Sequence, residues 1–271
     1  MIAASMSPKT VFFIIFGLLV ASAIATDEVL YPDVVKSLKS SPTELDKLNI
    51  LPDDKDWTFN YFSHAFHTNS PGGVVNANAA TFPATVGNGM TMAWISLGPC
   101  AMLPPHYHAR ASNYVVSVEG TTETYMTLEN GARVVKTLLE PGMMTLFPQG
   151  SLHTMSNTGC GNATLISALS SEDAGTHNVA NGLFDLPQSV VAAAFGGNPL
   201  SAKFVQLRRD IPAVGTGASI GSAECLKRCE AQGSKPSIQP SIKFFPRPHD
   251  IGGFTQHQKS LWEVLFGWWR I

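Results

Sequence analysis

The sequence predicts an all-β domain of sandwich or barrel type, with short helices on either side of it. From about residue 57, short β-prone runs alternate with turns rich in Gly, Pro and Asn, at intervals typical of antiparallel sheets. Residues 90–95 alternate Met and Trp with Thr, Ala and Ile, which is the period of a strand. A chain of 271 residues is long enough for one substantial core. We therefore expect one main domain, at residues 57–210.

The first residues have the layout of a secretory signal peptide. Lys9 precedes an apolar run at residues 11–21, and the small residues Ala23 and Ala25 follow it. The run is shorter than the roughly 20 residues of a membrane-spanning helix, and no basic cluster follows, so we favour secretion over a membrane anchor. The sequence predicts a signal peptide at residues 1–25, an extracellular or cell-wall protein, and no integral membrane span after cleavage.

A helical extension is predicted between the signal peptide and the β domain, at residues 26–56. The sequence Ser-Pro-Thr-Glu at 41–44 combines a serine cap, a proline in the first turn and a glutamate three residues after the cap. Leu45 and Leu48 would then form the buried face of this helix.

Within the main domain, turns at Gly, Pro and Asn separate five further predicted strands. A helix is expected to begin near residue 185 and to end at the glycine pair 196–197, with a second helix near 202–208. The five strands are predicted at residues 114–118, 122–128, 134–139, 144–147 and 164–169.

Residues 211–271 are rich in Gly, Ser and Pro and predict a tail outside the domain. The tail contains a short helix with Cys225 and Cys229, and its aromatic last segment, SLWEVLFGWWRI, has apolar residues at helical spacing. We favour an aromatic segment that packs on the domain or on a neighbouring subunit. A docking or membrane-surface helix and an artefact of gene prediction are the alternatives.

The charge of the chain argues against a nucleic-acid partner. The formal net charge is −2, only 14% of residues are charged, and Lys and Arg are scattered along the chain. The sequence also lacks a nucleophile elbow, a phosphate-binding loop and a dinucleotide-binding fingerprint. A small-molecule ligand or substrate is the partner that this composition favours.

Three histidines are the strongest candidates for a functional site. His106 and His108 are two residues apart on a predicted strand, so both side chains point to the same face of the sheet. His153 begins another predicted strand after a Pro-Gln-Gly turn, and Asn157 follows it. A barrel interior that brings these imidazoles together would offer a metal site.

These residues resemble the two motifs of the cupin family. Three sequence segments resemble in particular the germin-like and spherulin-like secreted cupins, including their fungal and slime-mould members: PPHYHARAS, ENGARVV and FPQGSLH. The resemblance covers roughly residues 57–208 and does not extend to the tail. The two motifs read His106-x-His108-x4-Asn113-x6-Gly120 and Gly142-x5-Pro148-x-Gly150-x2-His153-x3-Asn157.

The resemblance implies a single jelly-roll barrel of roughly six to eight strands with flanking N- and C-terminal helices. It also implies a homo-oligomer and one divalent metal ion, often manganese, held by three histidines and a glutamate. Carried over to this chain, the ligands are His106, His108 and His153. Asn113 occupies the glutamate position, and Glu119, six residues further along the same strand, is no substitute for it.

The change to asparagine alters the expected metal. Three neutral imidazoles and a carboxylate leave a net charge of +1 on a site with a divalent ion, whereas Asn113 leaves +2. Manganese prefers anionic oxygen ligands, so the affinity of the site for manganese is lowered. The affinity for zinc, copper or iron rises relative to that for manganese. We expect Asn113 to be a weak fourth ligand or a neighbour of the ligands. In the alternative interpretation, the histidines are remnants that only make hydrogen bonds.

Four cysteines fit two disulfides in an oxidising compartment, and three pairings exist. Because Cys100 and Cys160 each flank a motif that must reach the same site, we expect them to pair with each other. Cys225 and Cys229 would then form a local pair. Asn162, in the sequence Asn-Ala-Thr, is a candidate glycosylation site.

The sequence supports functions of different classes. The resemblance implies a metal-binding extracellular oxidoreductase that acts on a small oxygen-rich species such as superoxide or oxalate. Asn113 favours the alternative, a non-catalytic extracellular or cell-wall protein, stress- or spore-associated, whose metal is structural or absent. Binding or storage of a small ligand in the barrel is a third hypothesis.

Overall fold

The computed structural model describes residues 29–197 and 203–234. The predicted signal peptide at 1–25 and the aromatic last segment lie outside the described residues. Within the described ranges, no helix combines the length and the apolar character needed to cross a membrane.

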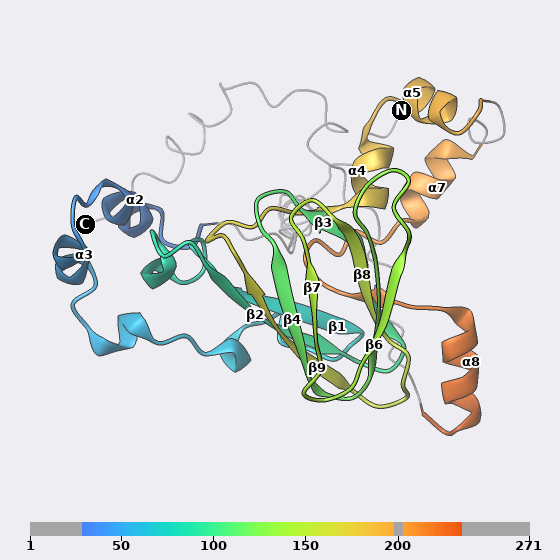
Figure 1. Cartoon of the computed structure of the whole chain (residues 1–271), viewed down its shortest axis with the longest axis horizontal. Helices are drawn as coiled ribbons and strands as arrows, with labels where there is room; N and C mark the ends of the chain where they lie inside the picture. The colour runs from blue at the N-terminus through green and yellow to red at the C-terminus, as the bar shows by residue number, and fades with distance from the viewer. Residues whose placement is uncertain (1–28, 198–202, 235–271) are drawn as a thin grey trace, which may run out of the picture. The chain divides into compact units, whose positions relative to one another are not determined.

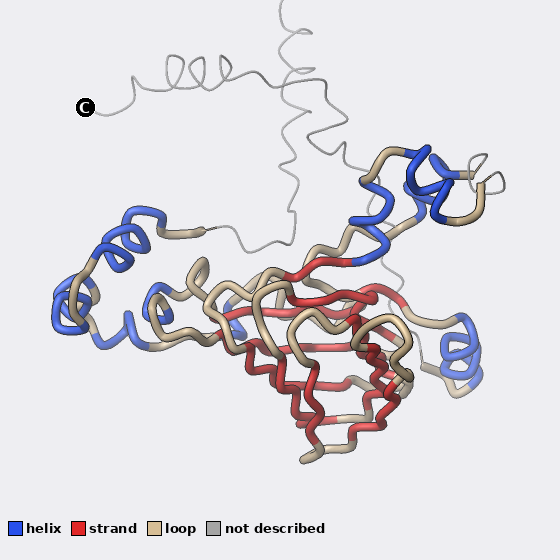
Figure 2. Tube along the Cα trace, turned by 45° about the horizontal axis from the view of Figure 1, so that its top comes forward, coloured by secondary structure: helices blue, strands red, loops and turns tan. Residues whose placement is uncertain are grey.

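Two antiparallel sheets face each other and form a β-barrel of jelly-roll type (Figures 1 and 2). One sheet has five strands in the order β1-β2-β9-β4-β7, and the other has β10-β3-β8-β5-β6 with β11 paired to β3. The strands are β1 (Gly72–Ala77), β2 (Thr91–Leu97), β3 (Ala101–His108), β4 (Asn113–Glu119), β5 (Thr122–Thr127), β6 (Val135–Leu139), β7 (Met144–Phe147), β8 (Leu152–Asn157), β9 (Ala163–Leu169), β10 (Thr176–Asn178) and β11 (Ser219–Ile220).

Alternating side chains explain why these segments form strands. In β9 every second residue, from Ala163 to Leu169, is buried, and the residues between them are half-buried. In β2 the residues Thr91, Ala93 and Ile95 point inward, whereas Met92 is exposed. The inward side chains of both sheets form one apolar core that includes Val74, Ile95, Leu97, Leu103, Val115, Leu139, Phe147, Met155 and Leu165.

The five strands predicted after residue 113 are confirmed as β4, β5, β6, β7 and β9, with ends shifted by a residue at most. The helix expected after residue 185 is confirmed as α5 (Gln188–Ala194), and the next one as α7 (Phe204–Asp210). Helix α4 (Val179–Asp185) was not predicted. Phe184 of α4, Val191 of α5 and Phe204 of α7 pack together, and Figure 1 shows these helices grouped outside the strands.

The N-terminal segment forms α2 (Pro32–Ser40) and α3 (Glu44–Ile50), followed by the short 3-10 helices η1 (Asp54–Trp57) and η2 (Tyr61–Ser63). A third 3-10 helix, η3, spans Pro83–Thr85 and lies between β1 and β2. The buried residues of α2, the residue after α3 and the segment that contains η3 form a small apolar cluster: Val35, Leu38, Leu51, Ala79 and Val86.

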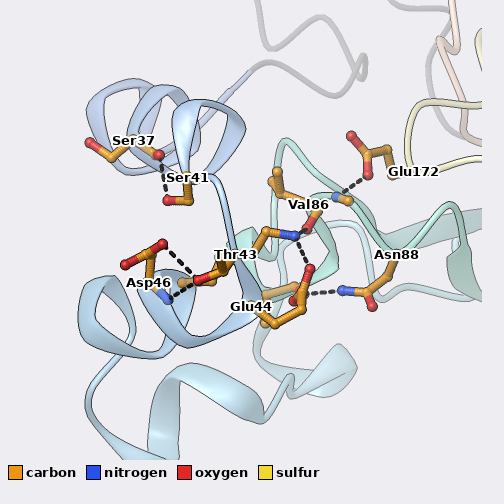
Figure 3. A network of polar contacts seen from close by, with 11 residues as sticks. Ser37, Ser41, Thr43, Glu44, Asp46, Val86, Asn88 and Glu172 are labelled. Carbon is orange, nitrogen blue, oxygen red and sulfur yellow. Dashed lines mark hydrogen bonds and ion pairs between the residues drawn. The ribbon is translucent and has the colours of Figure 1, made fainter.

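Two details of the predicted N-terminal helix are wrong. Thr43 caps α3 in place of Ser41, because Thr43 Oγ1 accepts a hydrogen bond of 3.2 Å from the backbone N–H of Asp46 (Figure 3). Leu45 and Leu48 are 70% and 50% exposed and form no buried face. The apolar cluster is filled from α2 and the chain after α3, so the leucines of α3 are left in solvent.

Helix α8 (Ala223–Ala231) confirms the short helix expected around the last two cysteines. It does not lie in a free tail, since β11 pairs with β3 just before it. The backbone N–H of Gly221 donates a 2.7 Å hydrogen bond to the carbonyl of Cys100, so the chain enters α8 beside that cysteine.

The expected disulfide pairing is wrong. The structure joins Cys100 to Cys225 and Cys160 to Cys229. The physical reason is the helix: residues four apart lie on the same face, so Cys225 and Cys229 both face the barrel. Their Cβ atoms are then about 5–6 Å apart, more than the roughly 3.5–4.5 Å that a disulfide between them would need. Cys100 and Cys160 are the two barrel thiols that meet this face, and the disulfides fix α8 to the barrel.

Candidate metal centre

Neighbouring strands bring the three predicted histidines together. β3 and β8 are antiparallel partners in which His106 lies directly opposite His153, and His108 follows His106 on the same face. All three side chains are buried, and their ring nitrogens lie within 4.8 Å of one another. The ring centroids of His106 and His153 are 4.3 Å apart, and those of His108 and His153 are 5.2 Å apart.

Each imidazole has a partner on its Nδ1 atom. The Nδ1 of His106 lies 2.7 Å from the carbonyl of Pro104, and that of His153 lies 2.9 Å from the carbonyl of Ser151. A backbone carbonyl can only accept, so these contacts place the proton on Nδ1 and leave Nε2 with a free lone pair. This tautomer is the one in which Nε2 can bind a metal ion.

Burial keeps the three imidazoles neutral. The pKa of His108 is lowered to about 3 and that of His153 to about 2, mainly by desolvation on burial and secondly by electrostatic repulsion from His106. Desolvation also lowers the pKa of His106, against an opposing hydrogen bond to Pro104. Neutral imidazole is the form that binds metals, so the site needs no proton release from histidine near neutral pH.

The donor set fits a metal ion. His153 Nε2 is buried and has no hydrogen-bond partner within residues 29–197 and 203–234, a costly state for a polar atom that a bound cation would remove. Three convergent imidazole nitrogens are a known donor set for zinc and for other transition metals. The histidines therefore form a candidate metal centre.

Asn113 lies at the site, as expected, at the start of β4. It is buried, and its Nδ2 lies 3.4 Å from His108 Nε2. Its Oδ1 accepts a hydrogen bond from Ser167 of β9. Neither Ser167 nor Thr176, whose hydroxyl lies 3.2 Å from His108 Nδ1, was predicted.

A cavity of about 210 Å³ opens onto the site from inside the barrel. This volume is below the roughly 300–1,000 Å³ of pockets for drug-sized ligands, so it suits a small molecule. His106, His108, Asn113 and Ser167 line one part. The other walls combine apolar core residues with polar residues of β1, β2 and β10, with the loop after β9 and with the segment before β11. In that loop Asp173, which also lines the cavity, forms a 2.6 Å ion pair with Arg110.

Other motif residues have structural positions. Asn157 is buried: its Nδ2 donates to the carbonyls of Leu97, Gly98 and Gly161, and its Oδ1 accepts from Gly159 N–H. The amide therefore ties together two turns at one end of the barrel.

Two further residues of the sequence analysis lie on the surface. Glu119 is exposed and accepts a hydrogen bond from Thr164, so it does not take part in the histidine site. Asn162 is exposed just before β9, where its side chain can be reached by solvent.

The fold and the three-histidine site define a cupin, and a family model described as Cupin matches residues 59–201. The chain belongs to this family. Within it, the chain is 32% identical over 201 residues to Spherulin-1A of Physarum polycephalum, which covers 73% of this chain and 79% of the relative. It is 32% identical over 188 residues to Germin-like protein 1-1 of Oryza sativa subsp. japonica, covering 65% and 85%. The protein is thus a germin- and spherulin-like cupin.

Solved structures agree on the fold. One described as concerning the mechanism of oxalate oxidase has a TM-score of 0.52 at 22% identity and covers 58% of this chain and 80% of that chain. Another, procruciferin, an 11S globulin from Brassica napus, has a TM-score of 0.54 at 17% identity and covers 60% and 41%. Because an oxidase and a globulin share this barrel, the fold alone does not define the activity.

Proposed function

We propose that this cupin is a secreted metalloprotein that binds one divalent transition metal through His106, His108 and His153 and acts as an oxidoreductase on a small oxygen-rich molecule. Superoxide and oxalate are the proposed substrates, and the oxalate oxidase among the structural neighbours suggests the second. The observation that carries the proposal is His153 Nε2, which is buried, neutral and without a partner in the described chain. Manganese, zinc, copper and iron are the candidate ions.

Each residue of the site has a defined role in this proposal. The carbonyls of Pro104 and Ser151 orient His106 and His153 so that Nε2 faces the shared space. The small cavity limits the ligand to a few heavy atoms. A bound ion would supply Lewis acidity or a one-electron couple to a ligand in an open coordination position.

The proposed extracellular location is supported by the two disulfides and by the exposed sequon residue Asn162. Release into the medium by cells that express the full chain, with an N-terminus after Ala25, is the expected result. Retention in the cytosol with four free thiols would contradict it.

Turnover by protein loaded with a single metal tests the oxidoreductase. Metal-free protein is loaded in parallel with manganese, zinc, copper or iron, and the consumption of superoxide and of oxalate is followed for each sample. We expect activity with a redox-active ion and none with zinc or in His108→Ala, because that variant loses a nitrogen ligand. Stoichiometric binding of all ions without turnover of either substrate would contradict the enzymatic part of the proposal.

Asn113 favours a second candidate, a non-catalytic extracellular cupin in which the metal is structural. The two candidates differ in metal exchange, because a closed structural site resists chelators and a catalytic site keeps an exchangeable position. Release of the metal to a chelator within minutes, without unfolding, supports the enzyme. Release only on unfolding supports the structural protein.

A further inference from the structure

Asn113 and Ser167 form a buried pair beside the three histidines. Both residues are only 2% exposed. They lie diagonally across β4 and β9, in which Asn113 pairs with Leu169 and Val115 pairs with Ser167. Ser167 donates a hydrogen bond to Asn113 Oδ1, and in the described ranges its hydroxyl makes no other hydrogen bond. The amide oxygen, which is the atom that could bind a metal, therefore contacts Ser167, while the amide nitrogen lies on the side of His108.

The other end of the amide faces His108. Asn113 Nδ2 lies 3.4 Å from His108 Nε2, and Thr176 Oγ1 lies 3.2 Å from His108 Nδ1. With its proton on Nδ1, His108 donates from Nδ1 to Thr176 Oγ1 and accepts at Nε2 from Asn113 Nδ2. Each of these side-chain polar atoms, from Ser167 through Asn113 and His108 to Thr176, then has a hydrogen-bond partner. If the Asn113 side chain were rotated so that Oδ1 and Nδ2 exchanged places, the Ser167 hydroxyl would be left buried without an acceptor for its proton.

We infer that Ser167 holds Asn113 as a hydrogen-bond donor to a small anion in the cavity, and that Asn113 is not a metal ligand. The inference rests on the metal site proposed above. A divalent ion bound to the three imidazoles takes the lone pair of His108 Nε2 and frees the N–H of Asn113 to donate elsewhere. The acceptor nearest to this N–H is then the ligand that completes the site.

Charge indicates that this ligand is an anion. Imidazole ligands bring no charge, so an ion held by three of them keeps its full +2 charge. The described residues that line the cavity include no lysine or arginine. Asp173, the acidic residue of the lining, is paired with Arg110. A small oxyanion neutralises the ion and accepts the N–H of Asn113, which makes the hydrogen bond a strong, charge-assisted one.

Azide binding to the cobalt(II)-loaded protein tests the inference, with cobalt absorption as the readout for both metal and anion. We expect Asn113→Leu to retain cobalt with less than about a threefold change in affinity and to bind azide about tenfold more weakly, as expected for one lost hydrogen bond. Ser167→Ala should also bind azide more weakly, because the amide of Asn113 loses its fixed orientation. Ser167→Thr keeps a hydroxyl at this position and should bind azide with the affinity of the wild type.

Ser117→Ala is the matched control, since Ser117 is a buried serine of β4 whose hydroxyl contacts the carbonyl of Gly120 and not the site. The inference is overturned if the affinity of Asn113→Leu for cobalt falls about tenfold or more and its affinity for azide rises, because Asn113 would then be a metal ligand. It is also overturned if Ser167→Ala binds azide like the wild type. Absence of cobalt binding in the wild type would instead overturn the metal site itself.

Discussion

At the scale of single residues, the asparagine beside the histidines would influence which ions the proposed metal centre binds. An amide brings no charge, so the ion loses the Coulombic stabilisation that a carboxylate would supply. The affinity for manganese, which prefers anionic oxygen ligands, is lowered more than the affinity for zinc or copper.

Restoring the carboxylate should therefore raise manganese affinity. We expect Asn113→Glu to bind manganese about tenfold or more tightly than the wild type in a titration of metal-free protein, since about 1.4 kcal/mol corresponds to a factor of ten. Asn113→Gln has the same length without the charge and should show no gain. Equal or weaker binding by the glutamate variant would refute the placement of residue 113 beside the metal.

The neutral histidines should make the metal-free protein sensitive to acid. The unfolded chain protonates His108 and His153 near their ordinary pKa of 6.5, whereas burial lowers the folded pKa values to about 3 and about 2. As pH falls below 6.5, the unfolded state binds protons that the folded state does not, so the free energy of unfolding decreases down to about pH 3.

Urea unfolding of metal-free protein at pH 7.5 and pH 5 measures this effect. We expect a lower midpoint at pH 5, and a smaller decrease in His153→Leu, because the variant lacks one of the groups that protonate on unfolding. An equal decrease in both proteins would show that His153 does not contribute.

The sequence predicted the histidines but not the residues that orient them. Spacing alone places His106 and His108 on one face, and the motif adds His153. Ser167 and Thr176 reach the site only because β9 lies beside β4 and β10 lies beside β3. Such pairings between distant strands are set by the folded sheets and leave no local signal in the sequence.

At the scale of elements, Asn157 links the end of β8 to the turns around it. Its amide makes four hydrogen bonds to backbone groups, three as donor and one as acceptor. We expect Asn157→Ala to lower the free energy of unfolding by about 2–4 kcal/mol, because these buried groups lose their partner. Urea unfolding measures the loss, and a change below about 0.5 kcal/mol would contradict this role.

The two disulfides make α8 part of the barrel. They close loops with sequence separations of 125 and 69 residues, so they restrict the unfolded chain strongly. We expect the double variant Cys160→Ser/Cys229→Ser to lose about 2–5 kcal/mol of unfolding free energy. Peptide mapping of the unreduced wild type should recover Cys100 linked to Cys225, and a peptide linking Cys100 to Cys160 would contradict the structure.

Strands with alternating residues and clear turns were predictable, and elements without them were not. β1 starts with two glycines and is buried on nearly every residue, so it shows no alternation. Helix α3 has leucines at helical spacing, yet they are exposed, because spacing predicts a helix without identifying what covers it. The cysteine pairing failed for a similar reason, since it depends on where α8 lies.

At the scale of the whole molecule, the barrel and its inner cavity surround the three histidines of the candidate metal centre. The apolar core between the sheets surrounds the histidines and lowers their pKa values, and the strand pairing of β3 with β8 aligns their nitrogens. The same burial would make an empty centre costly. We therefore expect the metal-loaded protein to be the stable form.

Elemental analysis of the untagged protein, purified from a secreting host beside a His153→Ala variant, tests this account most directly. We predict about one equivalent of a divalent transition metal in the wild type, because three buried nitrogens converge on one space, and little or none in the variant. Unfolding curves should show that both proteins are folded. No metal in the wild type, even after reconstitution, or equal metal in both proteins, would contradict the account.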